Sequence, residues 1–240
     1  KTNAPPKGAP SYAATSYGEL RNYSDMPEMG AIDEATTRRL IHGYYAATSY
    51  MDSQLGRVLD EAESLNLLDN TIVILWGDHG WHLGDHGMWC KHTNYEQAAR
   101  IPVIVAAPSG QKNQSSVALI ESVDIFPTVA QLAGLPIPKE IDGRSFASVI
   151  ADPSAIARPY VTHVYPRGQQ IGRAIRDARY RLVEWKVPGK SADSAEIELY
   201  DYQADPLETA NLADTNPQVV HSMRALLAEH PEAKHSLRGK

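Results

Sequence analysis

Residues 71–106 constrain the fold of this chain most strongly, because two short apolar runs flank a polar, glycine-rich loop. The first run covers residues 71–76 (TIVILW), and the second covers residues 101–106 (IPVIVA). Short apolar runs bounded by loop residues are typical of strands that are buried on both faces of a parallel sheet. Open α/β sheets place their ligand sites at the carboxyl ends of such strands. The sequence therefore predicts an active-site loop between two buried strands.

The loop is rich in residues that bind ions. Four histidines, two aspartates and four glycines fall within the sixteen residues 77–92. Asp78 and His79 follow the first strand, and a glycine on each side lets the backbone turn so that both side chains can face one cation. A turn-capping Asp beside a hydrogen-bonded His is the alternative, but the preceding strand and the histidine density favour metal ligands. Lys91, in the same loop, suits the oxygens of an anionic substrate.

The other side chains of the loop leave alternatives open. His82, His86 and His92 could be further ligands, and their spacing would permit a zinc site. However, the tetrapeptide Gly-Asp-His-Gly occurs twice, and the second copy favours a turn with a hydrogen-bonded histidine over a second metal centre. Cys90 is interpreted as a small apolar residue rather than a nucleophile, because no helix start that would stabilise a thiolate is evident. Trp81 is interpreted as a packing residue.

Length and charge argue against several classes of protein. A chain of 240 residues can form one large α/β domain with a small appendage. The net charge of -6 gives no electrostatic case for nucleic acid, so we expect no nucleic-acid partner. No apolar run approaches the length of a membrane span, so we expect no membrane partner. The chain starts at Lys1 without an initiator methionine, which indicates a piece of a longer protein.

The pattern of apolar residues changes near residue 155, and we predict two parts on that basis. Residues 1–154 are predicted to belong to an α/β catalytic domain, and residues 155–240 to form a small antiparallel α+β subdomain. Asp33 is predicted to cap one long helix, or the first of two consecutive helices, over residues 33–65. Further predicted helices cover residues 94–100, 123–133, 146–150 and 218–229, and further predicted strands cover residues 117–121, 160–164, 173–177, 180–187 and 196–201.

The loop and its flanks also carry a family resemblance. They combine LWGDHG (residues 75–80), LGDHGMW (residues 83–89), Lys91 and ARIPVI (residues 99–104). In this combination they resemble type I sulfatases of the alkaline phosphatase superfamily, above all the iduronate-2-sulfatase group and related bacterial polysaccharide sulfatases. The resemblance implies the C-terminal half of an alkaline-phosphatase-like, mainly parallel sheet domain, followed by a small antiparallel α+β subdomain. Further matching segments are residues 44–57, 123–128, 142–145 and 173–185.

The resemblance implies roles for the loop residues. Asp78 and His79 would supply two ligands to a calcium ion (Ca2+), although histidine is a less usual ligand for this hard cation. Lys91 and His79 would be catalytic, while Lys91 and His92 would bind the substrate, with Lys91 on the sulfate group. The nucleophile of the family is a formylglycine hydrate made from a Cys or Ser in a C/S-x-P-x-R motif, and the metal polarises the sulfate oxygens.

The chain departs from the family pattern at the nucleophile. Cys90 is followed by Lys-His-Thr-Asn, without the Pro and Arg of the motif, and no serine begins such a motif. We therefore expect part of a sulfuric ester hydrolase that is inactive without an N-terminal part of the same sulfatase. The implied substrate is a sulfated polysaccharide or the uronic acid of a glycosaminoglycan. The resemblance also implies a periplasmic, extracellular or lysosomal parent protein.

Two other functions stay open at this point. A zinc phospho- or phosphonate hydrolase of the same superfamily would need two metal ions, with His82 or His86 as a ligand. A non-catalytic fragment that binds glycan or serves as a structural partner is the other. Arg167, Arg173 and Arg176 could contact sugar carboxylates, because a guanidinium binds a carboxylate in bidentate fashion. Their alternative role is that of surface charges on strands.

Overall fold

The computed structural model describes residues 4–15 and 18–235. The chain forms two compact units that each combine segments distant in sequence. The first unit draws on residues 1–20, 79–100 and 158–240, and the second on residues 21–78 and 101–157. The division into domains at residues 1–154 and 155–240 stays a prediction.

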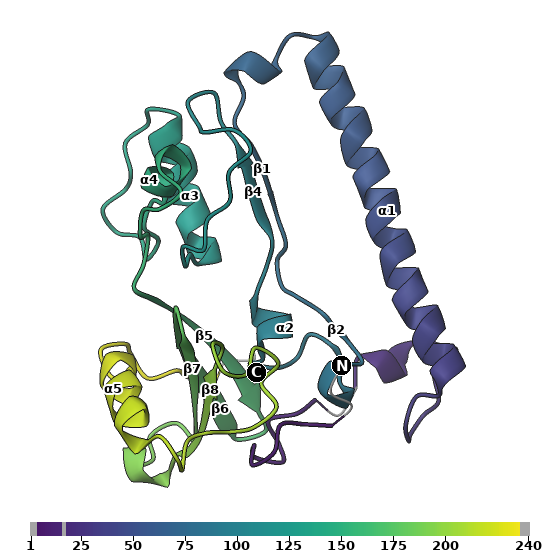
Figure 1. Ribbon diagram of the computed structural model, residues 1–240, viewed down its shortest axis with the longest axis vertical. Helices are drawn as coiled ribbons and strands as arrows, with labels where there is room; N and C mark the ends of the chain where they lie inside the picture. The colour runs from purple at the N-terminus through teal and green to yellow at the C-terminus, as the bar shows by residue number, and fades with distance from the viewer. Residues whose placement is uncertain (1–3, 16–17, 236–240) are drawn as a thin grey trace, which may run out of the picture. The chain divides into compact units, whose positions relative to one another are not determined.

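The first unit is built on a four-stranded antiparallel sheet (Figure 1). Consecutive strands pair; tight turns join β5 to β6 and β6 to β7, and a longer connection with a short 3-10 helix (Ala192–Ser194) joins β7 to β8. At one turn the Asp177 carboxylate accepts hydrogen bonds from the backbone N–H groups of Arg179 and Tyr180, at 2.7 and 2.6 Å, as an Asp in a tight turn commonly does. The four strands predicted for this region are confirmed. They are β5 (Tyr160–Arg167), β6 (Gln170–Asp177), β7 (Tyr180–Lys186) and β8 (Glu196–Asp201), in that order across the sheet.

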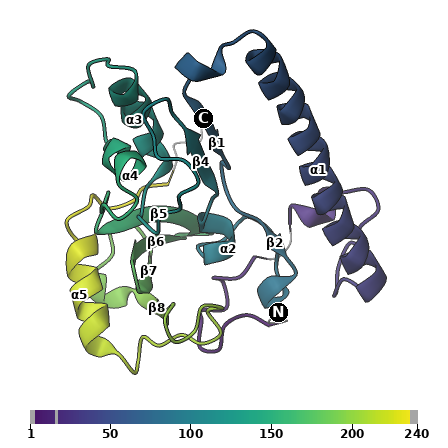
Figure 2. The same cartoon turned by 45° about the horizontal axis from the view of Figure 1, so that its top comes forward.

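Alternation of side chains along the strands gives this sheet two apolar faces. In β7, Leu182 packs on one face and Val183 on the other, and both are fully buried. The helix α5 (Pro217–Leu227) covers the Leu182 face with Met223 and Leu227. It lies along the sheet in both views of the chain (Figures 1 and 2). The predicted C-terminal amphipathic helix is therefore confirmed.

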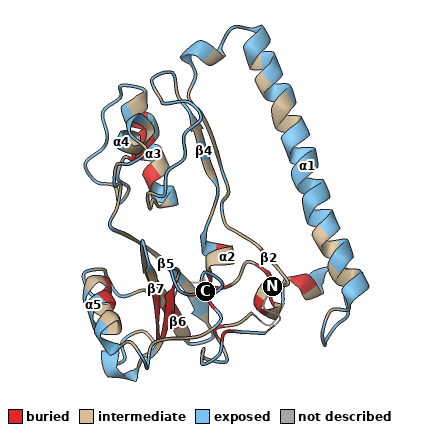
Figure 3. Cartoon of the chain, in the orientation of Figure 1, coloured by how far each residue is buried: buried red, intermediate tan, exposed pale blue. Residues whose placement is uncertain are grey.

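The opposite face of the sheet is covered by segments that are far away in sequence. Met88 and Tyr95 of the central loop and Ala13 of the N-terminal segment pack against Val183 and Trp185. Within this unit, the buried residues drawn in red lie in the sheet and in the segments that cover it (Figure 3). The loop is therefore part of the core of the first unit, and packing defines its path.

A buried ion pair joins the loop to the sheet. Arg181 of β7 and Glu208 are both fully buried, and Nε of the guanidinium donates to Glu208 Oε1 at 2.8 Å. Nη1 of Arg181 donates to the carbonyl of Asn94, and Glu208 Oε2 accepts from the N–H of Glu96 at 3.2 Å. Burial opposes the charge of Arg181, but the Glu208 carboxylate, together with Glu198 and the tyrosines around the guanidinium, outweighs this effect and raises the pKa of Arg181 well above its ordinary value. The pair therefore anchors the backbone of the loop at two points.

The second unit contains the long helix α1 (Glu34–Ser64). The Asp33 side chain caps it by accepting from the N–H of Thr36 at 2.8 Å, which confirms the predicted cap. None of its 31 residues, all of which the structure describes, is buried (Figure 3). Residues 117–121, also described, form no strand, so that prediction is wrong. The shorter helices are α3 (Ile125–Leu132) and α4 (Ala147–Ala151).

The two apolar runs around the loop differ from their prediction. β1 (Val73–Trp76) and β4 (Val103–Ala106) form an antiparallel pair in which Trp76 lies opposite Val103. Parallel neighbours need a crossover connection of about a dozen or more residues, usually a helix. The connection here holds the four-residue helix α2 (Glu96–Ala99), and the chain returns at the end of β1 that it left. Neither strand contains a buried residue, so the prediction of buried parallel strands is wrong for this pair.

Across the residues that the structure describes, every helix is too short or too polar to cross a bilayer.

We expect Glu208→Gln to destabilise the first unit by about 3–5 kcal/mol, because it leaves the Arg181 guanidinium buried without its counter-charge. Urea unfolding followed by tryptophan fluorescence measures the change. Glu232→Gln is the matched control, since it removes a carboxylate from a partly exposed pair with Lys186 in the same unit, and it should move the midpoint little. Equal shifts from both substitutions would contradict this role of the buried pair.

Candidate functional site

The first Gly-Asp-His-Gly of the loop contains the two predicted metal ligands. Asp78 ends a segment of the second unit, and His79 begins a segment of the first. The carbonyl of Gly80 lies 2.9 Å from His79 Nδ1. Because a carbonyl can only accept, Nδ1 carries the proton, and Nε2 of the neutral ring carries the lone pair. A Cβ on Gly80 would lie 1.9 Å from the carbonyl oxygen of Gln97, so only glycine allows the loop to approach α2 this closely.

The second half of the loop folds as a hairpin of β2 (His82–Leu83) and β3 (Trp89–Cys90). His82 Nδ1 lies 2.5 Å from Asp85 Oδ2, and His82 Nε2 lies 2.7 Å from Thr93 Oγ1. Burial opposes the charge of Asp85, but the hydrogen bond and charge of His82, together with the backbone N–H of Leu83, outweigh burial and lower the pKa of Asp85. Carboxylate, imidazole and hydroxyl stand in the order of a nucleophile relay. However, His82 and Thr93 are buried, so the three side chains hold the hairpin together instead.

The second histidine of the hairpin is also a core residue. His86 is buried with a φ of 52°, and its ring centroid lies 5.3 Å from that of Tyr95. Burial lowers its pKa, so the ring is neutral at pH 7. The second Gly-Asp-His-Gly is therefore a packed turn, which agrees with the preferred interpretation of the sequence. Nowhere in the described part of the chain do three His, Cys, Asp or Glu side chains gather closely enough to hold a metal ion.

The predicted substrate-binding residues Lys91 and His92 lie together and bind one carboxylate. Lys91 Nζ is 2.7 Å from Glu19 Oε1, and His92 Nε2 is 2.8 Å from Glu19 Oε2. The hydroxyl of Tyr165 lies 2.6 Å from the other ring nitrogen of His92, Nδ1. These four residues are named the Glu19 cluster. The side chains of Glu19, Lys91 and His92 are 22%, 28% and 35% exposed, so a solute can reach them.

Trp81 connects the two predicted parts of the site. Its ring stacks on the imidazole of His79 with the centroids 6.0 Å apart and the planes 25° apart. Lys91 Nζ lies 5.1 Å from the indole centroid, within the range of a cation–π interaction. His79 and Lys91 therefore both contact the ring of Trp81. Sequence reasoning gave Trp81 only a packing role, because a lone tryptophan in a loop carries no periodic signal.

Arg167 borders the Glu19 cluster. Its guanidinium lies 4.8 Å from the ring centroid of Tyr165, donates from Nη2 to the carbonyl of His92, and donates from Nε to the carbonyl of Tyr12 at 3.1 Å. It also lines a cavity of about 450 Å³. The residues around this cavity are Ser11, Tyr12, Ala14, Thr15, Arg167 and Gly168. Arg167 therefore joins the cluster to a hollow in which part of a larger ligand could lie.

The other two predicted arginines have partners within the first unit. Arg176 forms an ion pair with Glu96 at 3.2 Å and lies over the ring of Tyr202. Arg173 donates to the carbonyl of Leu227, at 2.7 Å, at the end of α5. Both guanidinium groups join parts of the unit to one another, which offers a structural explanation for their presence on the strands.

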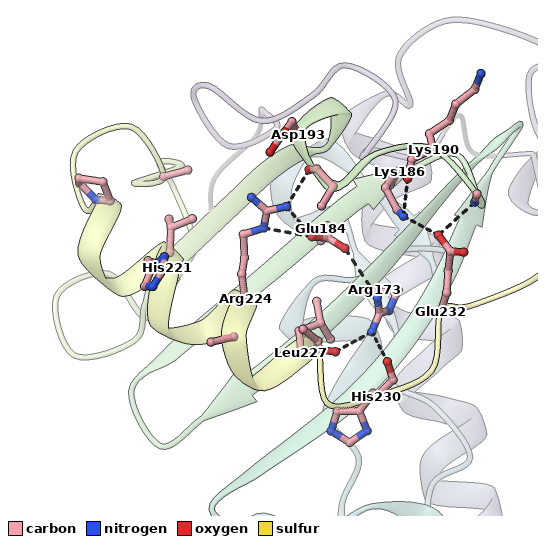
Figure 4. A pocket seen from close by; sticks show the side chains of 17 residues that line it. Arg173, Glu184, Lys186, Lys190, Asp193, His221, Arg224, Leu227, His230 and Glu232 are labelled. Atoms are coloured by element: carbon pink, nitrogen blue, oxygen red, sulfur yellow. Dashed lines mark hydrogen bonds and ion pairs between the residues drawn. The ribbon is translucent and has the colours of Figure 1, made fainter.

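A second cavity, of about 840 Å³, lies between the sheet and α5 (Figure 4). Basic side chains line it, but carboxylates accompany them. Glu184 lies between Arg173 and Arg224, at 3.7 and 3.0 Å, and Glu232 lies 2.5 Å from Lys186. Because these cations are already paired with carboxylates, the cavity attracts an anionic ligand less strongly than its number of basic residues suggests.

Cys90 does not have the environment of a nucleophile. It is buried with a φ of 67°. Burial, reinforced by the charge of Glu19, raises the pKa of its thiol to about 11. A protonated, inaccessible thiol agrees with the interpretation of Cys90 as a small apolar residue.

Sequence comparison relates the chain to sulfatases. The family described as "Sulfatase" matches residues 2–135, and the family described as "N-sulphoglucosamine sulphohydrolase, C-terminal" matches residues 84–233. A sulfatase of Formosa agariphila is 30% identical, over 85% of this chain and 39% of its own length. The iduronate 2-sulfatase of Mus musculus is 26% identical, over 91% of this chain and 53% of its own length. The chain therefore spans about half or less of the length of these curated relatives.

Solved structures extend this similarity to the fold. A structure described as a 2-O GAG sulfatase is 28% identical with a TM-score of 0.73, covering 82% of this chain and 44% of that chain. One solved in complex with its substrate D-glucosamine-2-N,6-O-disulfate is 30% identical with a TM-score of 0.66, covering 74% and 37%. The phosphonate monoester hydrolase of Silicibacter pomeroyi has a TM-score of 0.77 over 98% and 51%, but at 22% identity it shows the fold alone.

We expect Cys90 in the folded chain to resist iodoacetamide at pH 8. With a pKa of about 11, roughly one thiol in a thousand is ionised at that pH, and the side chain is also buried. Mass spectrometry of the treated chain should show the unmodified mass, whereas the same treatment in denaturant should add one carbamidomethyl group. Rapid alkylation of the folded chain would contradict this burial.

Proposed function

Because this chain belongs to the sulfatase family, whose match covers residues 2–135, we propose that it carries part of the active site of a sulfuric ester hydrolase. It has the α/β fold of solved sulfatases. The observation that supports the proposal best is the Glu19 cluster, where Lys91 and His92 hold one carboxylate between them. An ammonium and an imidazole that bind two oxygens of a carboxylate can bind two oxygens of a sulfate group.

The roles of the two residues follow from their chemistry. The Lys91 ammonium would neutralise the charge that develops on the sulfate oxygens as the ester bond breaks. Tyr165 contacts Nδ1 of His92, so Nε2 is the nitrogen that faces the anion, and as an N–H it would donate to a sulfate oxygen. Neither residue is a nucleophile in this arrangement. We propose that the nucleophile, a formylglycine, comes from an N-terminal part of the same sulfatase that this chain does not contain.

We also propose that Asp78 and His79 supply two ligands to a Ca2+ ion. The lone pair of His79 lies on Nε2, because Nδ1 donates to the carbonyl of Gly80, and this is the usual arrangement of a ligating histidine. The Asp78 oxygens suit a hard cation, and further oxygen ligands would come from the N-terminal part. A bound cation would supply Lewis-acid polarisation of the sulfate oxygens. His79 also contacts Trp81, which in turn contacts Lys91, so loss of the metal should affect the anion site.

For the substrate, we propose a sulfated saccharide that contains a uronic acid. A similar protein solved with a glucosamine disulfate supports a sulfated saccharide, and one named iduronate 2-sulfatase supports the uronic acid. Arg167 stands beside the Glu19 cluster and lines the neighbouring cavity of about 450 Å³, where it could bind a sugar carboxylate. Enzymes that act on such polymers meet them outside the cytosol, so we propose a periplasmic, extracellular or lysosomal location.

A phosphonate or phosphate hydrolase with two metal ions is less well supported. Similar structures include a phosphonate monoester hydrolase. That mechanism would need ligands from His82 or His86, yet both are buried, with His82 held by Asp85 and Thr93. Using either as a ligand would require the hairpin to open.

We expect Lys91→Ala in the complete sulfatase to lower kcat/KM for sulfate release by roughly 10²–10³, the usual cost of losing one charge-stabilising group. Its metal content should stay unchanged. Lys190→Ala, which removes an exposed lysine outside the Glu19 cluster, is the matched control and should keep full activity. Full activity of Lys91→Ala would contradict the assignment of the anion site.

We expect Asp78→Ala in the complete protein to abolish both calcium binding and sulfate release while leaving the fold intact. Metal analysis of the purified protein, with sulfate release measured by ion chromatography, tests the two effects together. Retained metal would remove Asp78 from the ligand set. Hydrolysis of phosphate esters in preference to sulfate esters would favour the alternative function.

A further inference from the structure

We propose that Glu19 is a built-in competitor at the anion site, whose carboxylate occupies the donors of Lys91 and His92 until a sulfate group displaces it. The inference rests on the proposed function, because it takes Lys91 and His92 as the donors that bind sulfate. Nothing in the sequence pattern singles out Glu19, which lies 72 residues before Lys91.

The geometry is that of one anion bridging two donors. The two oxygens of a single carboxylate lie 2.7 Å from Lys91 Nζ and 2.8 Å from His92 Nε2. Two oxygens of a sulfate group have a similar spacing and could make the same two contacts. Both anions cannot occupy the donors at once, because like charges at such a distance repel. The carboxylate and the sulfate therefore exclude one another.

Glu19 is an anion at neutral pH. Burial of its carboxylate opposes ionisation, but the hydrogen bond and charge of Lys91, followed by the effects of His92, outweigh burial and lower the pKa of Glu19. The Glu19 side chain is 22% exposed, with Oε2 buried beside His92 and Oε1 bound to Lys91. When a sulfate group takes its place at the donors, the side chain turns toward solvent.

The two donors have other contacts that keep them in place when Glu19 leaves. His92 is held by Tyr165 at Nδ1, and its carbonyl accepts from Arg167. The Lys91 ammonium lies over the ring of Trp81. If Glu19 were needed to position the donors, these contacts would be superfluous. Their presence supports a competing role for Glu19 rather than a positioning role.

Because Glu19 competes for the donors, a ligand binds only if its interactions with Lys91 and His92 are strong enough to displace the Glu19 carboxylate. An acetate ion offers the same two oxygens as Glu19 and has to be bound from dilute solution, so it should not displace the attached carboxylate. A sulfate group has an additional oxygen that can bind a further donor or cation. The site should therefore prefer sulfated groups over simple carboxylates, a useful property in an enzyme whose substrate carries both.

The test compares sulfate binding by the 240-residue chain and its Glu19→Gln variant. Sodium sulfate is titrated at constant ionic strength while NMR follows the backbone amides of residues 91–93 and the ring signals of His92. Loss of the competing charge is expected to tighten sulfate binding about 5-fold or more, the factor that corresponds to one charge interaction near 4 Å in water. Glu19→Ala should show the same direction, which separates the effect from any new contact made by Gln.

Two control substitutions make the outcomes distinguishable. Glu232→Gln, at another paired carboxylate of the first unit, should leave sulfate binding unchanged. Lys91→Met in the Glu19→Gln background should abolish it. If Glu19→Gln binds sulfate no better than the original chain while Lys91→Met still weakens binding, the competitor role is overturned and the anion site stands. If Lys91→Met has no effect on binding in either background, the proposed function itself fails.

Discussion

The first unit depends on the carbonyl of Asn94, where the buried Arg181 and the half-buried His163 meet. Nη1 of Arg181 donates to this oxygen, and Nε2 of His163 lies 3.2 Å from it. Burial, followed by the charge of Arg181, lowers the pKa of His163 to about 4, so its ring is neutral at pH 7. One positive charge therefore enters the core, and the Glu208 carboxylate balances it. This node fixes the loop three residues after Lys91, and the buried side chains of Met88 and Trp89 fix it just before. The loop is held on both sides, which leaves Lys91 and His92 at its accessible turn.

Features with a local cause could be predicted from the sequence. Asp33 caps α1 because a carboxylate reaches an N–H three residues ahead. The strands β5 to β8 are predictable because short, roughly alternating segments stand between turn residues. The direction of β1 and β4 could not be predicted in this way. Their apolar runs are the same for parallel and antiparallel pairing, and direction depends on the path of the connection. The exposure of these strands and of α1 could not be predicted either, because composition shows which residues are apolar but not what covers them.

The candidate site shows the same limit. Lys91 and His92 are adjacent in sequence, and the resemblance to sulfatases predicted both as substrate-binding residues. The carboxylate between them belongs to Glu19, which lies in a segment without a periodic pattern. Tyr165 contributes from β5, and Trp81 from the other end of the loop. Glu19 and Tyr165 lie more than 70 residues from Lys91 and His92 in the sequence, and only the fold brings them together. The histidines of the hairpin illustrate the reverse. His82 and His86 have the residue type and spacing of metal ligands, yet burial against Thr93 and Tyr95 gives them structural roles.

The first unit combines segments that are distant in sequence, and this arrangement also affects how such genes can evolve. The sheet of β5 to β8 has two apolar faces, and α5 covers only one of them. The other face needs Ala13, Met88 and Tyr95, which precede the sheet in the chain by some distance. A recombination event that moved only the four strands and α5 into another protein would leave one apolar face of the sheet exposed to solvent. We therefore expect evolution to keep the sheet together with the loop that bears Lys91 and His92. Related genes should differ by substitutions in these two segments rather than by recombination that separates them.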